Sequence, residues 1–276
     1  MSGPVSILGG GDFGWALADA ARRSGREVIV WTRRAQEQAR EGVTVTETLA
    51  DAAAADLVFF AVPSPYVGAV ARELGAHLDG SHRLVHISRG VVADKHTPRT
   101  LTQVLRETTP CRRIGALAGP IVARALAEGD ASAGVVGSRF PEIVEAVRDV
   151  FAVQRLDVFG TDDVLGVELA STMVSLLSMA IGYGLASGLG PATLAMVATR
   201  GMNEAARIGE GLGARAETFH GLAGLGDLLA AFAGDGRPEL EVGRLFAAGV
   251  TPAEVDKQVG ARIEGLRTAR WIAKYA

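Results

Sequence analysis

The chain has 276 residues, a formal net charge of −3 and one cysteine, Cys111. This length can bury two separate cores, and the slightly acidic balance lacks the basic footprint that a nucleic-acid partner would require. A single cysteine excludes an internal disulfide and a multi-thiolate metal site, so we expect no bound metal and a cytoplasmic protein.

The N-terminal part alternates short apolar segments with helical patterns. The first predicted strands are Val5–Leu8, Glu27–Trp31, Leu57–Val62 and Leu84–Ser88, and the first predicted helices are Trp15–Ser24 and Tyr66–Leu78. Two further predicted strands, Ala133–Val136 and Arg155–Val158, flank a helix at Pro141–Phe151. Such alternation is typical of βαβ units. We therefore predict an α/β fold with a Rossmann-type, doubly wound, mostly parallel sheet in a domain of residues 1–160.

A glycine-rich turn follows the first predicted strand and opens the first helix. Its residues are Gly9, Gly10, Gly11, Asp12, Phe13 and Gly14. In the pattern Gly-x-Gly-x-x-Gly, the first glycine permits a tight turn, the second lets the backbone approach a pyrophosphate, and the third lets helix and strand pack closely. The pattern alone is weak in a chain with 35 glycines. Its place between strand and helix favours a dinucleotide site over an ordinary glycine turn.

The end of the second predicted strand bears on the choice of nucleotide. Thr32, Arg33 and Arg34 follow it, where an acidic residue would bind the adenosine ribose and arginine would accommodate the 2′-phosphate of NADP. We therefore expect NADP in preference to NAD, while a solvated arginine pair at a strand end is the alternative. Pro63 and Ser64, after the third predicted strand, are expected near the ribose of the nicotinamide half.

Beyond Asp163 the pattern is helical throughout, which predicts an all-helical C-terminal domain of residues 161–276. Breaks are expected at the glycine-rich segments Gly188–Pro191, Gly211–Gly213, Gly221–Gly226 and Gly234–Gly236. The stretch Leu169–Thr199 carries no charged side chain and is long enough to span a bilayer. It contains serines and a proline and lacks flanking positive charge, so we predict a buried central helix and no membrane partner.

Several motifs occur in one order along the chain. They are the glycine turn, Pro63-Ser64, Ser88-Arg89-Gly90, Ala118-Gly119-Pro120, Gly166-Val167-Glu168-Leu169, Thr199-Arg200-Gly201-Met202, Thr218 to Leu228, and Glu264-Gly265-Leu266-Arg267-Thr268. In this combination the chain resembles the bacterial-type NAD(P)-dependent glycerol-3-phosphate dehydrogenase family. The resemblance implies reduction of dihydroxyacetone phosphate by hydride transfer from the nicotinamide. It also implies a helix lysine as proton donor, a second lysine nearby and an Arg-Asn pair that binds phosphate.

This chain departs from the family pattern at the catalytic centre. Val174 and Ser175 stand where the resemblance implies the catalytic Lys-Asn, and Arg89 replaces the second lysine. Arg89 can bind a phosphate or carboxylate through two parallel hydrogen bonds, but a guanidinium is a poor proton donor near neutral pH. Arg237 is expected to bind substrate as well. Asp227, which supports the lysine in the family, remains without that partner.

Two kinds of side chain could replace the missing lysine. Ser171, Ser175 and Ser178 form one stripe of the same helix, which could hydrogen-bond a substrate carbonyl or could simply permit close helix packing. His220 precedes the loop that ends in Asp227, and an imidazole titrates near the required pH. The candidate catalytic residues are therefore Asp227, His220 and Ser175, with a structural role as the alternative for His220.

Three functions remain open. The first, which we prefer, is an oxidoreductase acting on a small, phosphorylated or otherwise anionic ketone or alcohol. The second is a catalytically silent nucleotide-binding homologue that acts as a sensor or partner subunit. The third is a member of the wider β-hydroxyacid dehydrogenase group, which also uses a helix lysine. The chain stops soon after Gly265, where relatives continue, so we expect a shortened helical domain whose apolar face is covered in a homodimer.

Overall fold

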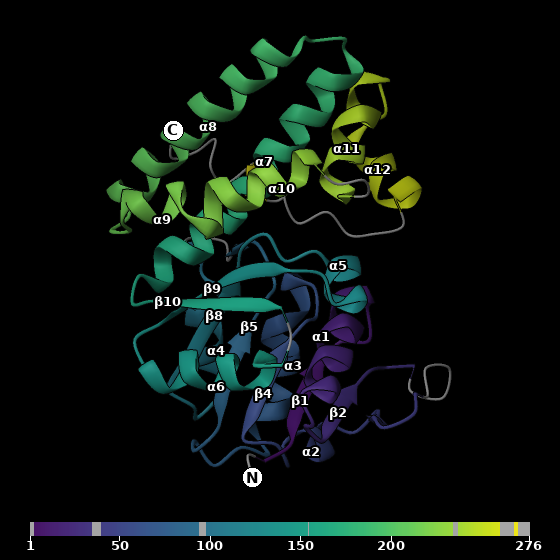
Figure 1. Cartoon of the computed structure of the whole chain (residues 1–276), viewed down its shortest axis with the longest axis vertical. Coiled ribbons are helices and arrows are strands. Elements are labelled where there is room, and N and C mark those ends of the chain that lie inside the picture. The colour runs from purple at the N-terminus through teal and green to yellow at the C-terminus, as the bar shows by residue number, and fades with distance from the viewer. Residues whose placement is uncertain are drawn as a thin grey trace.

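The computed structural model consists of a half built on a sheet and a half built of helices (Figure 1). It describes residues 3–34, 40–93, 98–153, 155–233, 237–259 and 268–269. In Figure 1 the sheet and its covering helices form the lower part of the molecule, and the C-terminal helices form the upper part. The predicted fold class, a doubly wound and mostly parallel sheet followed by helices, is confirmed.

Within the described residues, eight strands form one sheet in the order β10-β9-β8-β5-β4-β1-β2-β3. The strands are β1 (Val5–Leu8), β2 (Val28–Trp31), β3 (Thr44–Thr46), β4 (Leu57–Phe60), β5 (Arg83–His86), β8 (Arg113–Ala118), β9 (Ser132–Ser138) and β10 (Leu156–Thr161). All neighbours are parallel except β8 and β9. A separate antiparallel pair joins β6 (Val92–Ala93) and β7 (Pro98–Arg99). β1 is entirely buried, as expected of an apolar strand covered on both faces.

Helices cover both faces of this sheet. They are α1 (Asp12–Arg23), α2 (Leu49–Ala52), α3 (Ser64–Gly75), α4 (Leu101–Thr108), α5 (Ala123–Glu128) and α6 (Pro141–Phe151). Phe59 on β4 belongs to a buried apolar cluster with Trp15 and Phe151, from α1 and α6. Phe60, the next residue, belongs to a second cluster with Leu74 of α3. Because successive side chains alternate between the faces of a strand, the two clusters lie on opposite sides of the sheet.

The helical half begins soon after β10. Its elements are α7 (Val164–Ala186), α8 (Pro191–Gly211), α9 (Ala216–His220), a π-helical turn η2 (Leu222–Gly226), α10 (Asp227–Ala233), α11 (Pro238–Ala247) and α12 (Pro252–Val259). Asp163 caps α7, because its Oδ1 accepts a hydrogen bond of 3.0 Å from the backbone N–H of Gly166. α8 starts at Pro191, a residue suited to the first turn of a helix.

The predicted helix breaks have different outcomes. Helices end at Gly188–Pro191 and at Gly211–Gly213, as predicted. The break predicted over Gly221–Gly226 is confined to Gly221, whose extended backbone ends α9, because Leu222–Gly226 form the π-helical turn η2 and lead directly into α10. Glycine is required within it, since a Cβ on Gly224 would lie 2.0 Å from the carbonyl oxygen of Phe219. The segment Gly234–Gly236 lies outside the described residues.

α7 is the central helix of the helical half. Among the described helices, it alone is long and apolar enough to cross a membrane, yet 72% of its most apolar window is buried within the protein. It packs closely on α11. A Cβ on Gly182 would lie 2.0 Å from the carbonyl oxygen of Leu240, and a Cβ on Gly243 would lie 2.0 Å from the carbonyl oxygen of Met179. These glycines permit the close helix contact. The prediction of a buried central helix is confirmed for α7, whereas residues 187–199 form a break and the first turns of α8 and are mostly exposed.

Candidate functional site

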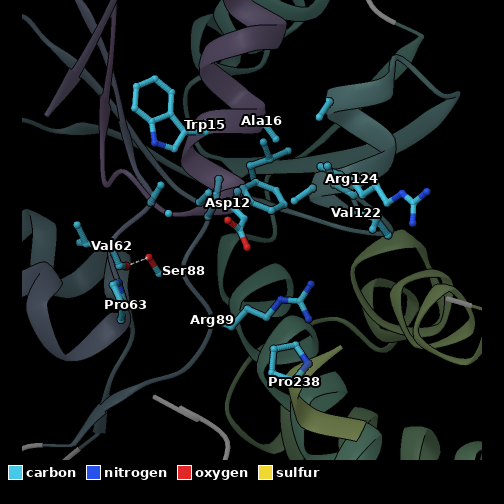
Figure 2. A pocket seen from close by; sticks show the side chains of 18 of the residues that line it. Asp12, Trp15, Ala16, Val62, Pro63, Ser88, Arg89, Val122, Arg124 and Pro238 are labelled. Carbon is cyan, nitrogen blue, oxygen red and sulfur yellow. Dashed lines mark hydrogen bonds between the residues drawn. The ribbon is translucent and has the colours of Figure 1, made fainter. Parts of the chain in front are cut away.

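A cavity of about 1230 Å³ lies at the carboxyl ends of the central strands. Segments that follow β1, β2, β4 and β5 line one part of it, and α7 with the start of α11 lines another. Figure 2 shows Asp12 at the start of α1, with Arg89 and Pro238 on the opposite side of the cavity. In doubly wound sheets, ligands bind where the strand order reverses, and β1 and β4 form that reversal here.

The glycine turn has the geometry that a pyrophosphate site needs. Gly9 has a φ of 130°, and a Cβ there would lie 2.7 Å from the carbonyl oxygen of Ala61. A Cβ on Gly14 would lie 1.9 Å from the carbonyl oxygen of Gly9, so α1 packs against the turn only because both residues are glycines. Gly11 has open space beside it and caps α1 without a side-chain hydrogen bond. The first amides of α1 can therefore bind an anion.

Arginines gather at the end of the cavity beside β2. Arg33 and Arg34 line the cavity, and the guanidinium of Arg33 lies 5.4 Å from the centre of the Tyr66 ring. Arg40 also lines it, 4.2 Å from the Trp15 ring. The sequence pattern did not predict Arg40 as a nucleotide-binding residue. Its only indication was that it is the third arginine after β2. These guanidiniums form a cationic cluster suited to a phosphate group.

The other predicted nucleotide-binding residues divide into two groups. Gly11, Asp12, Phe13 and Pro63 line the cavity directly, together with the two arginines after β2. The remaining residues do not line it. They are Gly9, Gly10, Gly14, Thr32 and Ser64. Thr32 is buried and its hydroxyl accepts a hydrogen bond of 3.4 Å from the backbone N–H of Arg34. The structure thus brings six of these residues to the wall of one cavity.

The opposite end of the cavity is organised by a buried carboxylate. Asp227 is fully buried at the start of α10. Nη2 of Arg89 lies 3.3 Å from its Oδ1 and 3.1 Å from its Oδ2, and Nη2 of Arg237 donates a hydrogen bond to Oδ1. Asp227 is therefore not without a cationic partner, because two arginines contact it.

Both arginines present donors to the cavity. Arg89 and Arg237 line it, with side-chain exposures of 25% and 13%, whereas Asp227 lies behind them. Among the described atoms, Nη1 of Arg237 is buried and has no hydrogen-bond partner. Because this atom is closed off from solvent, the donors that a ligand can reach are the exposed parts of the two guanidiniums.

The α7 wall of the cavity carries hydroxyls and no amine. Ser171 and Ser175 line the cavity, while Val174 is fully buried in an apolar cluster. Ser178 is also fully buried. The hydroxyl of Ser175 donates a hydrogen bond of 3.2 Å to Oε1 of Glu239, at the start of α11. Glu239 was missed from the sequence, which gives no sign that residues so far apart become neighbours.

His220 does not reach this cavity. It is exposed at the end of α9, and its Nε2 lies 3.1 Å from Oδ1 of Asn203. No part of it appears among the residues that line the cavity. The structure therefore brings Ser175 to the cavity and Asp227 to its wall, and it places His220 on the surface of the helical half.

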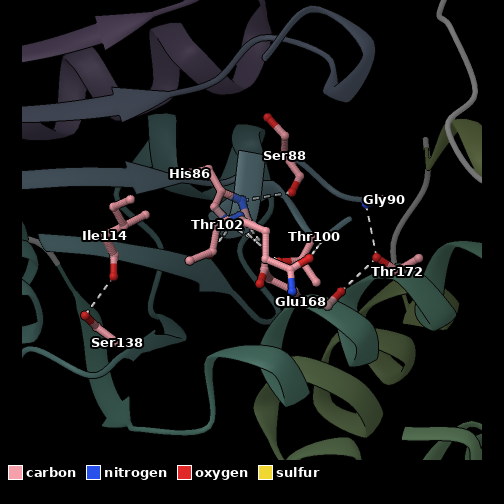
Figure 3. A network of polar contacts seen from close by, with 10 residues as sticks. His86, Ser88, Gly90, Thr100, Thr102, Ile114, Ser138, Glu168 and Thr172 are labelled. Atoms are coloured by element: carbon pink, nitrogen blue, oxygen red, sulfur yellow. Dashed lines mark hydrogen bonds and ion pairs between the residues drawn. The ribbon is translucent and has the colours of Figure 1, made fainter. Parts of the chain in front are cut away.

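A buried polar network holds the loop that carries Arg89 (Figure 3). Nε2 of His86 lies 3.0 Å from Oε1 of Glu168, and each of these side chains is 3% exposed. The loop continues from β5 through Gly90, whose N–H donates a hydrogen bond of 3.1 Å to Oγ1 of Thr172 on α7. β5 and α7 are thereby joined on both sides of Arg89, which fixes the position of its backbone.

The sheet half is doubly wound and carries an open glycine turn, and the helical half completes the same cavity. This combination defines the class of two-part nucleotide-dependent dehydrogenases. Comparison with known proteins agrees. Residues 38–144 match the model of the NAD-dependent glycerol-3-phosphate dehydrogenase N-terminus, and residues 163–276 match that of its C-terminus. The chain belongs to the NAD-dependent glycerol-3-phosphate dehydrogenase family.

Individual relatives cover nearly the whole chain. It is 32% identical to glycerol-3-phosphate dehydrogenase (NAD(P)+) of Azotobacter vinelandii, over 97% of this chain and 83% of the relative. It is 33% identical to glycerol-3-phosphate dehydrogenase (NAD(P)+) 1 of Salinibacter ruber, over 99% of this chain and 85% of that relative. The crystal structure of glycerol-3-phosphate dehydrogenase from Coxiella burnetii superimposes with a TM-score of 0.91 at 25% identity, over 100% of this chain and 89% of that one.

Proposed function

We propose that this chain is an NAD(P)-dependent oxidoreductase that interconverts a small anionic alcohol and its ketone. Glycerol 3-phosphate and dihydroxyacetone phosphate are the first candidates, because the named relatives are glycerol-3-phosphate dehydrogenases. The observation that carries the proposal is a single cavity with an open glycine turn at one end and two arginines held by Asp227 at the other.

Residues 1–160 would hold the nucleotide. The open backbone at Gly11 and the first amides of α1 suit the pyrophosphate, and Arg33 and Arg34 suit the 2′-phosphate that distinguishes NADP from NAD. Pro63 lies along the cavity wall between the two ends. When bound, the nicotinamide supplies the hydride chemistry, while the protein provides binding, orientation and electrostatics.

Residues 161–276 would complete the substrate end together with Arg89. The two guanidiniums there are balanced in charge by Asp227 and Glu239, so their hydrogen-bond donors, and not a net positive charge, would select an anionic substrate. Ser175 offers a hydroxyl to the reacting oxygen. Arg237 lines this end of the cavity, and its guanidinium could donate hydrogen bonds to a phosphate oxygen.

The test is turnover with purified protein. NADPH is mixed with dihydroxyacetone phosphate, with other ketone phosphates and with 2- or 3-keto acids, and loss of NADPH absorbance is followed. Turnover well above a blank is expected for a phosphorylated ketone. Arg237→Ala should raise KM for that substrate by about tenfold or more, since a charge-assisted hydrogen bond contributes about 1.5–3 kcal/mol. Arg244→Ala is the matched control. Arg244 lies on the exposed face of α11, the helix that Arg237 precedes, and its replacement should leave KM unchanged.

The burial of Val174 favours a second candidate, a nucleotide-binding homologue without turnover. This residue is fully buried in an apolar cluster, so α7 offers no amine to the cavity. Such a protein would act as a sensor or partner subunit. The same assay separates the two functions, because binding of NADPH without consumption of any ketone in the panel would establish the silent alternative.

A further inference from the structure

One of the carboxyl groups that line the cavity lies beside Ser175 of α7. Among the described residues that line it, the carboxyl groups belong to Asp12, Asp19 and Glu239. Asp19 is paired with Arg40 at 2.8 Å, at the end beside β2. Asp12 belongs to the first turn of α1, at the glycine turn. Glu239 alone belongs to the start of α11, beside the arginines of the substrate end.

The contact between Glu239 and Ser175 has a definite direction. The hydroxyl of Ser175 donates its only hydrogen to Oε1 of Glu239 over 3.2 Å. The lone pairs of the same oxygen remain able to accept a hydrogen bond. Ser175 is 3% exposed and lines the cavity, so a substrate hydroxyl could donate to it there. The two hydrogen bonds would then run in one direction, from substrate to Ser175 to Glu239.

The packing of the two helices fixes this contact. Ser175 lies on α7 and Glu239 on the first turn of α11. Gly182 and Gly243 allow the two helix backbones to approach so closely that neither position has room for a Cβ. Helices in such contact cannot slide without breaking it. The hydroxyl and the carboxylate are therefore held at hydrogen-bond distance by the fold.

We propose that Ser175 and Glu239 form a proton relay for the oxidoreductase reaction proposed above, on which this inference rests. In alcohol oxidation, the C–H bond of the substrate breaks, and an oxidised nicotinamide, when bound, would supply the acceptor for its hydride. The O–H bond breaks, its proton passes to Oγ of Ser175, and the hydroxyl proton of Ser175 passes to the carboxylate of Glu239. The products are a ketone, a reduced nicotinamide and a protonated Glu239, which releases its proton to solvent. Ketone reduction follows the same steps in reverse.

The relay explains how the reaction can proceed without an amine on α7. Arg89 and Arg237 bind but exchange protons poorly, because a guanidinium stays protonated in proteins. A carboxylate that acts through a hydroxyl supplies the missing acid and base. Ser175 is the catalytic residue, since it touches the reacting oxygen, and Glu239 acts through it.

The experiment compares Glu239→Gln, Ser175→Ala and the double variant with the parent protein. Oxidation of glycerol 3-phosphate and reduction of dihydroxyacetone phosphate are both measured. Each single change should lower kcat by about 100-fold or more, the usual contribution of general acid–base catalysis. The double variant should be no slower than the slower single variant, because the two groups act in one relay. Ser175→Thr, which keeps a hydroxyl, should retain most of the activity.

Binding provides a readout independent of turnover. The NADPH affinity, from fluorescence titration, and the glycerol 3-phosphate affinity, from calorimetry, should be unchanged in Glu239→Gln, which also establishes that the variant is folded. Glu241→Gln is the matched control, since Glu241 lies on the same helix, is exposed and pairs with Arg244. Its kcat should equal that of the parent.

The outcomes separate this inference from the proposed function. A parent protein that binds NADPH but turns over no ketone overturns the proposed function and the relay with it. An active parent in which Glu239→Gln keeps kcat within about threefold overturns the relay alone. The relay is also overturned if the fold-reduction in kcat of the double variant equals the product of the two single fold-reductions. That result would show that the two residues act independently.

Discussion

Asp227 has the strongest single influence on the substrate end of the cavity. Its carboxylate is fully buried and contacts both Arg89 and Arg237. A buried carboxylate is strongly disfavoured without cationic partners, and the arginines are in turn kept from extending into solvent. One residue that does not itself line the cavity therefore determines where its two cationic donors lie.

We expect Asp227→Asn to reduce both stability and substrate binding. The change leaves two guanidiniums without their shared countercharge, and breaking a buried ion pair costs about 3–5 kcal/mol. The free energy of unfolding, from urea denaturation, should fall by that amount, and KM for the anionic ketone should rise. Asp162→Asn is the control, because Asp162 pairs with Arg215 on the surface at 75% exposure, and little change is expected. Equal effects of the two variants would contradict this account of Asp227.

At the scale of helices and strands, sequence patterns predicted the elements that are apolar and continuous. Val5–Leu8 and Pro141–Phe151 were predicted with the bounds that the structure has. β8 was missed because Arg113–Ala118 contains glycine and two alanines, which have low strand propensity. β3 was missed because it has three residues and a partly exposed pattern. Local sequence does not reveal strands that depend on their neighbours in the sheet.

In the candidate site, too, some residues could be predicted from local sequence and others depend on contacts between distant segments. The glycine turn and Arg33 were found because their spacing along the chain carries the chemistry. Ser175 could be proposed from its helix, but its partner Glu239 lies 64 residues away and becomes a neighbour only through the packing of α7 on α11. Arg40 was missed for a similar reason, since it reaches the cavity through its contact with the Trp15 ring. Contacts between distant segments require the three-dimensional arrangement.

The α7–α11 contact leads to a prediction about Gly182. In Gly182→Ala, the new Cβ would meet the backbone carbonyl of Leu240, which cannot rotate away, so α11 must shift. We expect a loss of about 1–3 kcal/mol in stability and a fall in kcat, because the shift moves Glu239. NADPH affinity should be unchanged. Gly211→Ala is the control, since its Cβ would meet nothing within 4 Å, and it should be neutral or slightly stabilising in thermal unfolding. An unchanged kcat in Gly182→Ala would contradict the proposed coupling.

At the scale of the whole molecule, cationic side chains occupy both ends of one cavity in a protein with a net charge of −3. Arg33, Arg34 and Arg40 lie at one end, and Arg89 and Arg237 at the other. The sheet half supplies the first group, and the two halves together supply the second. A cavity with arginine donors at both ends suits a ligand pair that carries phosphates at both ends. An NADP-type nucleotide and a phosphorylated ketone together have that distribution of charge.

This arrangement predicts tighter binding of NADPH than of NADH, with a difference that depends on salt. The 2′-phosphate of NADPH would accept hydrogen bonds from Arg33 and Arg34, so Arg33→Ala should weaken NADPH binding by about tenfold and leave NADH binding nearly unchanged. Raising the salt concentration should narrow the difference between the two nucleotides, because screening weakens exposed charge pairs. Arg207→Ala, an exposed position that pairs with Glu204, is the control and should alter neither affinity. Fluorescence titration measures all six affinities, and tighter binding of NADH than of NADPH by the parent would contradict the role given to these arginines.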